Sequence, residues 1–137
     1  MEVQPKIRVL LVDDHPLFRN TMRSLLAPYP DVEVVGEAID GPEAVQCVEH
    51  LQPALVLMDI HLQQAMDGIA ATRLILSQNP GVAILGLSLD TRQYVISAMK
   101  HAGAFEVLAK EQTAANELYD AILRAVASKR PSDEAQP

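Results

Sequence analysis

Apolar residues fall into five short runs along the chain, and amphipathic stretches of helical length follow these runs. The runs predict strands over residues 7–12, 32–38, 54–58, 82–87 and 105–108, and the stretches after them predict helices over 16–27, 40–51, 69–78, 90–103 and 113–128. Short buried strands that alternate with helices are typical of a parallel sheet with helices on both faces. The pattern therefore predicts an α/β fold with a five-stranded parallel sheet.

Two of the predicted helices begin with a residue pair that suits a capping box. Asp40 is followed three residues later by Glu43, and Asp90 is followed at the same spacing by Gln93. In a capping box the first side chain accepts a hydrogen bond from a free amide of the first helical turn. We therefore expect helices to begin directly after Asp40 and Asp90.

Polar groups follow four of the predicted strands, at the point where each strand ends. These strand-end groups are Asp13 and Asp14 after IRVLLV, Asp59 after ALVLM, Ser88 after AILGL, and Lys110 after EVLA. Parallel sheets gather functional groups at the carboxyl ends of their strands, so the strand-end groups are expected to form one site. Packing does not require three carboxylates, a hydroxyl and an ammonium, whereas the binding of Mg²⁺ and a phosphoryl group does.

The carboxylates are the reason to expect Mg²⁺. This ion prefers oxygen ligands and is usually held by one or two carboxylates together with waters and a phosphate oxygen. Asp13 and Asp14, taken alone, fit equally well as caps of the helix that follows them. Asp59 has no such role, because the next helix begins several residues later. Ser88 can donate a hydrogen bond to one phosphoryl oxygen, and Lys110 can pair with another.

Composition excludes several classes of protein. The chain has 137 residues, of which 49% are hydrophobic and only 4% aromatic, as expected for one domain with an aliphatic core. A formal net charge of −7 opposes direct binding of nucleic acid, which requires clustered cations. No segment has the roughly 20 apolar residues of a membrane span, and no signal peptide is recognisable. The expected location is the cytoplasm, without a membrane partner.

With the strand-end groups in place, the chain resembles the receiver domains of two-component response regulators, which have the CheY-like fold. The phrases VLLVDDHPLFR, VVGEAIDGPEAV, LVLMDIHL, MDGIAATR and AMKHAGA are similar to receivers of the NarL/FixJ subfamily. The resemblance covers about residues 6–128, which leaves 129–137 as a polar tail or the start of a linker. It implies a doubly wound, flavodoxin-like (βα)5 fold with strand order 2-1-3-4-5.

The resemblance also implies a role for each group in phosphoryl transfer. Asp59 would be the phosphoacceptor, a nucleophile that takes a phosphoryl group from the phosphohistidine of a sensor histidine kinase. Ser88 would be the switch hydroxyl, and Lys110 would contact the phosphate. The domain would be a signalling receiver rather than an enzyme, although it would catalyse its own phosphorylation and dephosphorylation.

The same resemblance implies a set of metal ligands. Asp14, Asp59 and the backbone carbonyl of His61 would bind Mg²⁺, and Asp13 would help to hold the ion through water. Imidazole suits Mg²⁺ less well than oxygen does, so the ring of His61 is interpreted as a solvent-facing group at the rim. His15, which precedes a proline, is interpreted as a helix-entry residue.

The sequence departs from the family pattern at the position that usually carries a switching aromatic residue. Val107 stands there, three residues before Lys110. Strand alternation places Phe105 on the same face as Val107, but roughly 6.6 Å further along the strand, which makes it a poor substitute. We therefore expect the route from the site to the surface to differ from the usual one.

Receivers of this subfamily usually precede a helix-turn-helix domain. The resemblance therefore implies control of transcription through a DNA-binding domain outside this chain, while a stand-alone receiver fits the polar tail equally well. A homodimer formed on phosphorylation would use the last helix, the helix before it and the fifth strand.

Two competing functions remain open from the sequence. A haloacid-dehalogenase-like phosphatase also uses a strand-end aspartate with Mg²⁺, but it needs a second aspartate where His61 stands. An interaction module that no longer depends on phosphorylation is favoured by Val107 and opposed by the complete acidic pocket. A P-loop nucleotidase is excluded, because the chain contains no GxxxxGK[ST] motif.

Overall fold

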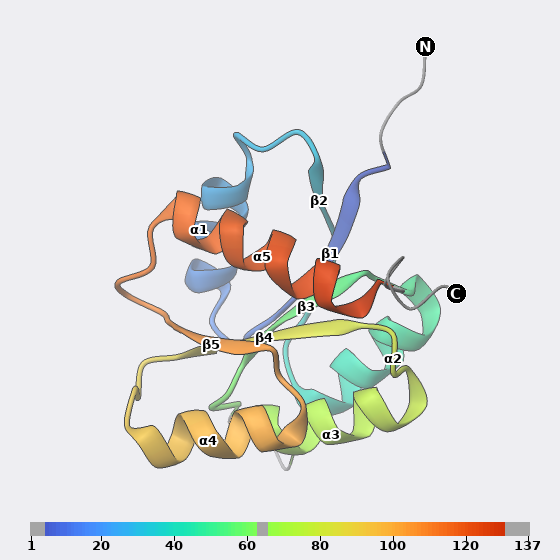
Figure 1. Ribbon diagram of the computed structural model, residues 1–137, viewed down its shortest axis with the longest axis vertical. Coiled ribbons are helices and arrows are strands. Elements are labelled where there is room, and N and C mark those ends of the chain that lie inside the picture. Colours follow the sequence, from blue (N-terminus) through green and yellow to red (C-terminus); the bar gives the residue numbers. More distant parts are fainter. Residues whose placement is uncertain (1–4, 63–65, 131–137) are drawn as a thin grey trace, which may run out of the picture.

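Strands and helices alternate along the chain in the computed structural model, which describes residues 5–62 and 66–130 (Figure 1). The strands are β1 (Ile7–Val12), β2 (Val32–Ala38), β3 (Leu55–Asp59), β4 (Ala83–Ser88) and β5 (Glu106–Ala109). The helices are α1 (Pro16–Leu26), α2 (Gly41–Leu51), α3 (Gly68–Gln78), α4 (Gln93–Ala102) and α5 (Ala115–Lys129). All strand pairs are parallel, and the order is β2-β1-β3-β4-β5. The predicted fold class and strand order are confirmed.

Helices cover both faces of the sheet, and each face has its own hydrophobic core. Figure 1 shows α1 and α5 on one side of the strands and α2, α3 and α4 on the other. Successive residues of β1 alternate between the two cores, since Leu10 and Val12 pack toward α2 and α3 whereas Val9 and Leu11 pack toward α1 and α5. Burial on both faces explains why the strands appear in the sequence as continuous apolar runs.

The strand order places a topological switch point between β1 and β3. The connection from β1 leads outward to β2, whereas the connection from β3 leads to β4 on the opposite side. Ligands of open α/β sheets bind at such a point, outside the carboxyl ends of the strands. Asp13 follows β1 directly and Asp59 is the last residue of β3, so both lie at the switch point.

The helix starts agree with the predicted capping in one case and not in the other. Asp40 is the N-cap of α2 and accepts a hydrogen bond from the amide of Glu43 at 2.9 Å. The prediction for Asp90 is wrong, because α4 begins only at Gln93 and its N-cap is Arg92. The carboxylate of Asp90 instead accepts hydrogen bonds from the amide and the guanidinium of Arg92. Because these local hydrogen bonds occupy the carboxylate of Asp90, it does not cap α4.

The expected common face of Phe105 and Val107 is also wrong. Val107 packs against the core on the α4 side, whereas Phe105 packs against the core on the α5 side. The guanidinium carbon of Arg124 in α5 lies 5.9 Å from the centroid of the Phe105 ring. Phe105 precedes the first residue of β5, so strand alternation does not fix its direction.

The last helix runs almost to the end of the described residues. α5 ends at Lys129, and most of the predicted tail, residues 131–137, lies outside the described residues. Across the helices that the structure describes, none combines the length and the apolar character needed to cross a bilayer.

Candidate functional site

Three carboxylates from two neighbouring strands meet at the switch point. Ligand atoms of Asp13, Asp14, His15 and Asp59 all lie within 4.8 Å of one another. Asp13 and Asp59 are each only 2% exposed. The loop after β1 and the end of β3 therefore build an acidic cluster, as the sequence predicts, in which Asp13 and Asp59 are buried and Asp14 is half-buried.

Asp59 is as deeply buried as Asp13 and lies at the end of β3. Its Oδ1 accepts a hydrogen bond from the amide of His61 at 3.1 Å, and its Oδ2 lies 3.4 Å from the Nζ of Lys110. Burial raises the pKa of Asp59 above its ordinary value, and the nearby charge of Asp13 raises it further, while Lys110 and the amide of His61 oppose the increase. The ionised carboxylate is therefore held in surroundings that favour an added cation.

Lys110 reaches the acidic cluster from the end of β5. Its amide donates a hydrogen bond to the carbonyl of Ser88 at 2.9 Å, which ties the residue to the end of β4. Its Nζ lies 2.6 Å from Oδ2 of Asp13 and 4.2 Å from the centroid of the Phe18 ring in α1. The lysine is 9% exposed, so its ammonium is positioned by contacts rather than by solvent.

His15 is one of the residues at the site that the sequence does not assign to it. It is the N-cap of α1, in agreement with its interpretation as a helix-entry residue, but its Nδ1 also lies 3.0 Å from both Asp13 Oδ1 and Asp14 Oδ1. Its amide donates to Asp13 Oδ1 at 2.9 Å. The helix has no side-chain cap, so the alternative role of the two aspartates as caps is not seen. The adjacency of a histidine to two aspartates was the available signal in the sequence.

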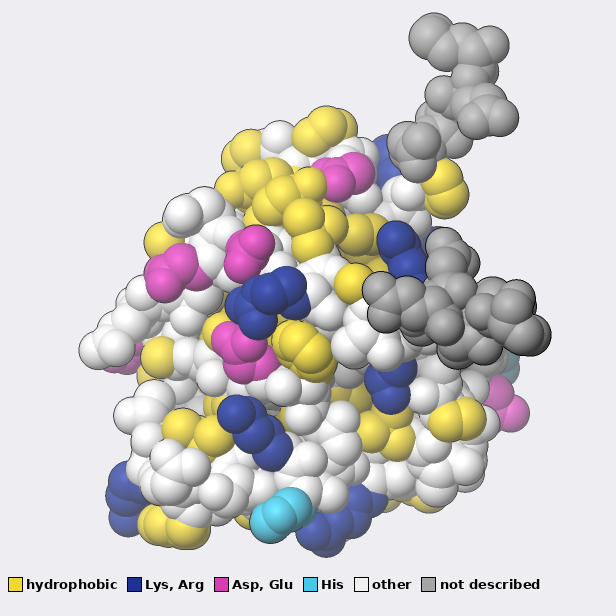
Figure 2. Space-filling view, in the orientation of Figure 1, with side chains coloured by type: hydrophobic (Ala, Val, Ile, Leu, Met, Phe, Trp, Pro, Cys, Tyr) yellow, Lys and Arg dark blue, Asp and Glu magenta, His cyan; other side chains and the backbone are white. Residues whose placement is uncertain are grey.

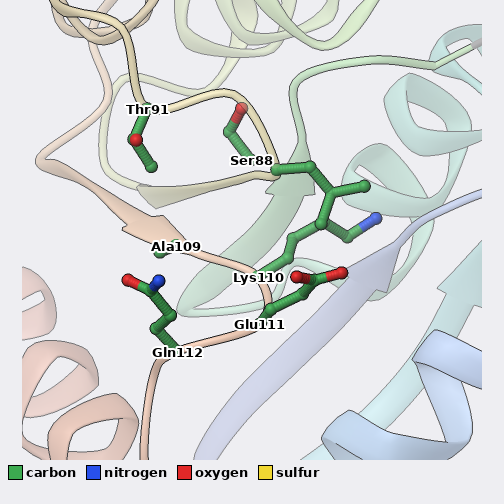
Figure 3. A pocket seen from close by; sticks show the side chains of 7 residues that line it. Ser88, Thr91, Ala109, Lys110, Glu111 and Gln112 are labelled. Atoms are coloured by element: carbon green, nitrogen blue, oxygen red, sulfur yellow. The ribbon is translucent and has the colours of Figure 1, made fainter.

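Ser88 lies at the end of β4 and is fully buried, but its hydroxyl does not join the carboxylates. The Oγ donates to the carbonyl of Asp90 at 2.7 Å and accepts a hydrogen bond from the amide of Asp90 at 2.9 Å. Ser88 lines a cavity of about 70 Å³ with Lys110 and neighbouring loop residues (Figure 3). Figure 3 shows the hydroxyl of Ser88 turned away from the ammonium of Lys110.

The donor set of the acidic cluster suits a hard divalent cation. Asp13 Oδ2 and Asp14 Oδ1 are shielded from solvent. Their neighbours among the described residues are the Nζ of Lys110, 2.6 Å from Asp13 Oδ2, and the Nδ1 of His15, 3.0 Å from Asp14 Oδ1. His61 is exposed, two residues beyond the end of β3, and its amide is held by Asp59. Clustered carboxylate oxygens are the ligands that Mg²⁺ prefers.

Comparison with known proteins identifies relatives over most of the chain. The family described as "Response regulator receiver domain" matches residues 9–123. The chain is 39% identical over 122 residues to the transcriptional regulatory protein DegU of Brevibacillus brevis, covering 88% of this chain and 49% of DegU. It is 39% identical over 132 residues to LiaR of Bacillus subtilis, covering 95% of this chain and 60% of LiaR. The chain thus spans about half to three-fifths of the length of these relatives.

Solved structures show the same similarity. The signal receiver domain of the response regulator NarL from Mycobacterium tuberculosis superposes with a TM-score of 0.84 at 30% sequence identity. The superposition covers 90% of this chain and 98% of the NarL domain. The similarity therefore extends over most of the chain.

Proposed function

Because the chain belongs to the family of response regulator receiver domains, we propose that it accepts a phosphoryl group on Asp59 and acts as the switch of a two-component system. The observation that carries this proposal is the position of Asp59, whose buried carboxylate is grouped with those of Asp13 and Asp14 and lies 3.4 Å from the Lys110 Nζ. A nucleophile, a cation to pair with phosphoryl oxygens and oxygen ligands for Mg²⁺ are thereby present within one small site.

The chemistry follows from the positions of the side chains. A carboxylate oxygen of Asp59 attacks the phosphorus of a phosphohistidine, the nitrogen–phosphorus bond breaks, and the imidazole leaves with the electron pair. Lys110, which pairs with Asp13 before the reaction, turns its ammonium to the new phosphoryl oxygens. The Ser88 hydroxyl exchanges its contact with Asp90 for a hydrogen bond to the phosphoryl group. The chain thereby catalyses its own phosphorylation and, with water as the nucleophile, its own dephosphorylation.

The proposed ligands of Mg²⁺ are Asp14, Asp59 and the backbone carbonyl of His61, with Asp13 assisting. Bound Mg²⁺ supplies positive charge beside the transferring phosphoryl group. Burial raises the pKa of Asp59 and the charge of Asp13 raises it further, so a cation between these two carboxylates also relieves their repulsion.

The proposed partners are a sensor histidine kinase in the cytoplasm and a DNA-binding output domain. The names of DegU and LiaR describe them as transcriptional regulatory proteins, and both are longer than this chain. A homodimer through α4, β5 and α5 is the proposed result of phosphorylation. Figure 2 shows acidic and basic side chains interspersed on the face that carries α5. Arg124 of α5 pairs with Glu106 of β5 at 2.8 Å.

The proposal is tested by adding acetyl phosphate and Mg²⁺ to the chain and measuring the intact mass. We expect the mass of one phosphoryl group on Asp59 in the wild-type protein and none in Asp59→Asn. Asp120→Asn is the matched control, because Asp120 is an exposed aspartate of α5 that is not part of the acidic cluster. This variant should be phosphorylated as the wild type is.

The same experiment distinguishes the competing functions. A folded wild-type chain that forms no adduct, and that does not bind beryllofluoride with Mg²⁺, would support an interaction module independent of phosphorylation. Continuous turnover of diverse phosphate esters would instead support a phosphatase.

A further inference from the structure

Arg19 of α1 turns back toward the loop that carries two of the strand-end groups. Its side chain is 13% exposed, and its Nη1 donates a hydrogen bond to the backbone carbonyl of Asp13 at 2.5 Å. Side chains of a helix incline toward its N-terminus, so a residue in the first turns of α1 can reach the strand end that precedes the helix. The long arginine side chain thereby links α1 to the acidic cluster without entering it.

A second contact fixes the direction of the guanidinium. The Nε of Arg19 donates to Oε1 of Glu37 in β2 at 2.5 Å, and the Nε of Arg23 donates to Oε2 of the same carboxylate at 2.5 Å. Burial raises the pKa of Glu37, but the hydrogen bonds from the two arginines outweigh it, so that the pKa is lowered and the group stays ionised at neutral pH. Glu37 therefore holds Arg19 in place from the neighbouring strand.

The contact with Arg19 completes the support of the Asp13 backbone. The amide of Asp13 donates to the carbonyl of Ala38 at 3.1 Å, which continues the pairing of β1 with β2. The carbonyl of Asp13 lies beyond the strand and before the helix, and it belongs to the peptide plane that connects Asp13 to Asp14. With the amide tied to β2 and the carbonyl tied to Arg19, the direction of both aspartates is set.

We propose that Arg19 is a positioning residue for the divalent-cation site, which it supports by fixing the peptide plane between Asp13 and Asp14. This inference rests on the proposed function, since it assumes that these aspartates hold Mg²⁺. The planar guanidinium donates in two fixed directions at once, to Asp13 and to Glu37. A lysine at this position supplies one compact charge and cannot make both bonds in these directions.

The test compares Arg19→Lys with Arg23→Lys in the complete 137-residue chain. Both variants lose a guanidinium bond to Glu37, but only Arg19→Lys loses the fork that also holds Asp13. Binding of Mg²⁺ alone is measured by titration calorimetry well below the unfolding temperature. The dissociation constant of Arg19→Lys should be about tenfold higher than that of the wild type, which is the magnitude found when residues that support metal ligands are replaced. Arg23→Lys should bind Mg²⁺ as the wild type does.

Nuclear magnetic resonance provides a readout that does not depend on metal. Without Mg²⁺, the amide resonance of Asp14 should shift in Arg19→Lys and stay in place in Arg23→Lys, because only the first substitution frees the peptide plane. Glu37→Gln is the second variant, and it should weaken Mg²⁺ binding less than Arg19→Lys because Arg19 remains.

The outcomes separate this inference from the proposed function. Unchanged Mg²⁺ affinity in a folded Arg19→Lys variant would overturn the positioning role and leave the proposed function standing. If that variant does not fold, unchanged affinity in Glu37→Gln has the same meaning. A wild-type chain that does not bind Mg²⁺ would overturn both.

Discussion

Lys110 lies between two kinds of partner, the carboxylates of the acidic cluster and an aromatic ring. Its Nζ is 2.6 Å from Asp13 Oδ2 on one side and 4.2 Å from the centroid of Phe18 on the other. A cation over an aromatic face is stabilised by the ring quadrupole, and more strongly where water is excluded. Phe18 therefore holds the lysine that is proposed to pair with the phosphoryl group.

Substitution Phe18→Leu tests this contact, because leucine keeps an apolar side chain against the core but lacks the quadrupole. We expect the free energy of unfolding, measured with urea and without Mg²⁺, to fall by about 1 kcal/mol. Phe18→Tyr keeps the aromatic face and should be close to wild type. An equal loss in both variants would show that packing, and not the cation–π contact, carries the effect.

The positions of the residues proposed to carry the chemistry could be predicted from the sequence, whereas the residues that support them could not. Asp59 and Lys110 follow apolar runs directly, and the end of a parallel strand fixes where such a residue lies. His15, Phe18 and Arg19 reach the site through tertiary contacts made at the start of α1. The periodicity of a helix shows which residues share a face, but not which strand end that face meets.

At the scale of elements, α3 begins in close contact with the end of β3. The amide of Gly68 donates to the carbonyl of Ile60 at 3.0 Å. A Cβ atom added at Gly68 would lie 2.1 Å from the carbonyl oxygen of Asp59 and 2.8 Å from the Cα of Ile60. These are backbone atoms that cannot turn aside, so the absence of a side chain lets the helix start against the strand that ends at Asp59.

Gly68→Ala should therefore disturb both stability and the site. We expect a loss of about 1–3 kcal/mol in the free energy of unfolding, as for other overpacked positions, together with weaker binding of beryllofluoride at Asp59. Gly81→Ala is the matched control, because an added Cβ there meets no atom within 4 Å. A Gly68→Ala variant with wild-type stability and adduct formation would mean that α3 shifts without moving Asp59.

The elements themselves could be predicted well where burial controls the sequence. Strands buried on both faces stand out as apolar runs, and Asp40 caps α2 as its pattern indicates. The prediction failed where local contacts compete with the pattern. Arg92 takes up the carboxylate of Asp90 and delays the start of α4 to Gln93. Phe105 follows its contacts with α5 because it lies just outside the strand.

At the scale of the whole molecule, the fold brings mutually repelling carboxylates together at the carboxyl ends of β1 and β3. The chain has a formal net charge of −7, and the buried carboxylates concentrate negative charge at the ends of β1 and β3. The pKa of Asp59 is raised by burial and by Asp13, which means that the folded state holds a proton on this group more strongly than the unfolded chain does. Ionisation of Asp59 therefore lowers the stability of the metal-free protein.

Because ionised Asp59 lowers the stability of the metal-free protein, Asp59→Asn should be more stable than the wild type at neutral pH. Below the ordinary pKa of 3.8, Asp59 is protonated in both the folded and the unfolded state, so it contributes no pH dependence there. As the pH rises through the higher folded pKa, the wild type loses stability that the asparagine variant keeps. Without Mg²⁺, Asp59→Asn should thus melt at a higher temperature than the wild type at pH 7, and this difference should shrink as the pH approaches 3.8.

Mg²⁺ should reverse this order in thermal melts at pH 7. Bound metal neutralises the repulsion, and a ligand present at about 100 times its dissociation constant adds about 2.7 kcal/mol to the stability of the state that binds it. The melting temperature of the wild type should rise with Mg²⁺, whereas that of Asp59→Asn should change much less, because the variant lacks both the repulsion and a metal ligand. Asp120→Asn, an exposed site on α5, should respond as the wild type does. Equal responses to Mg²⁺ in the wild type and in Asp59→Asn would place the metal elsewhere and remove Asp59 from its proposed ligands.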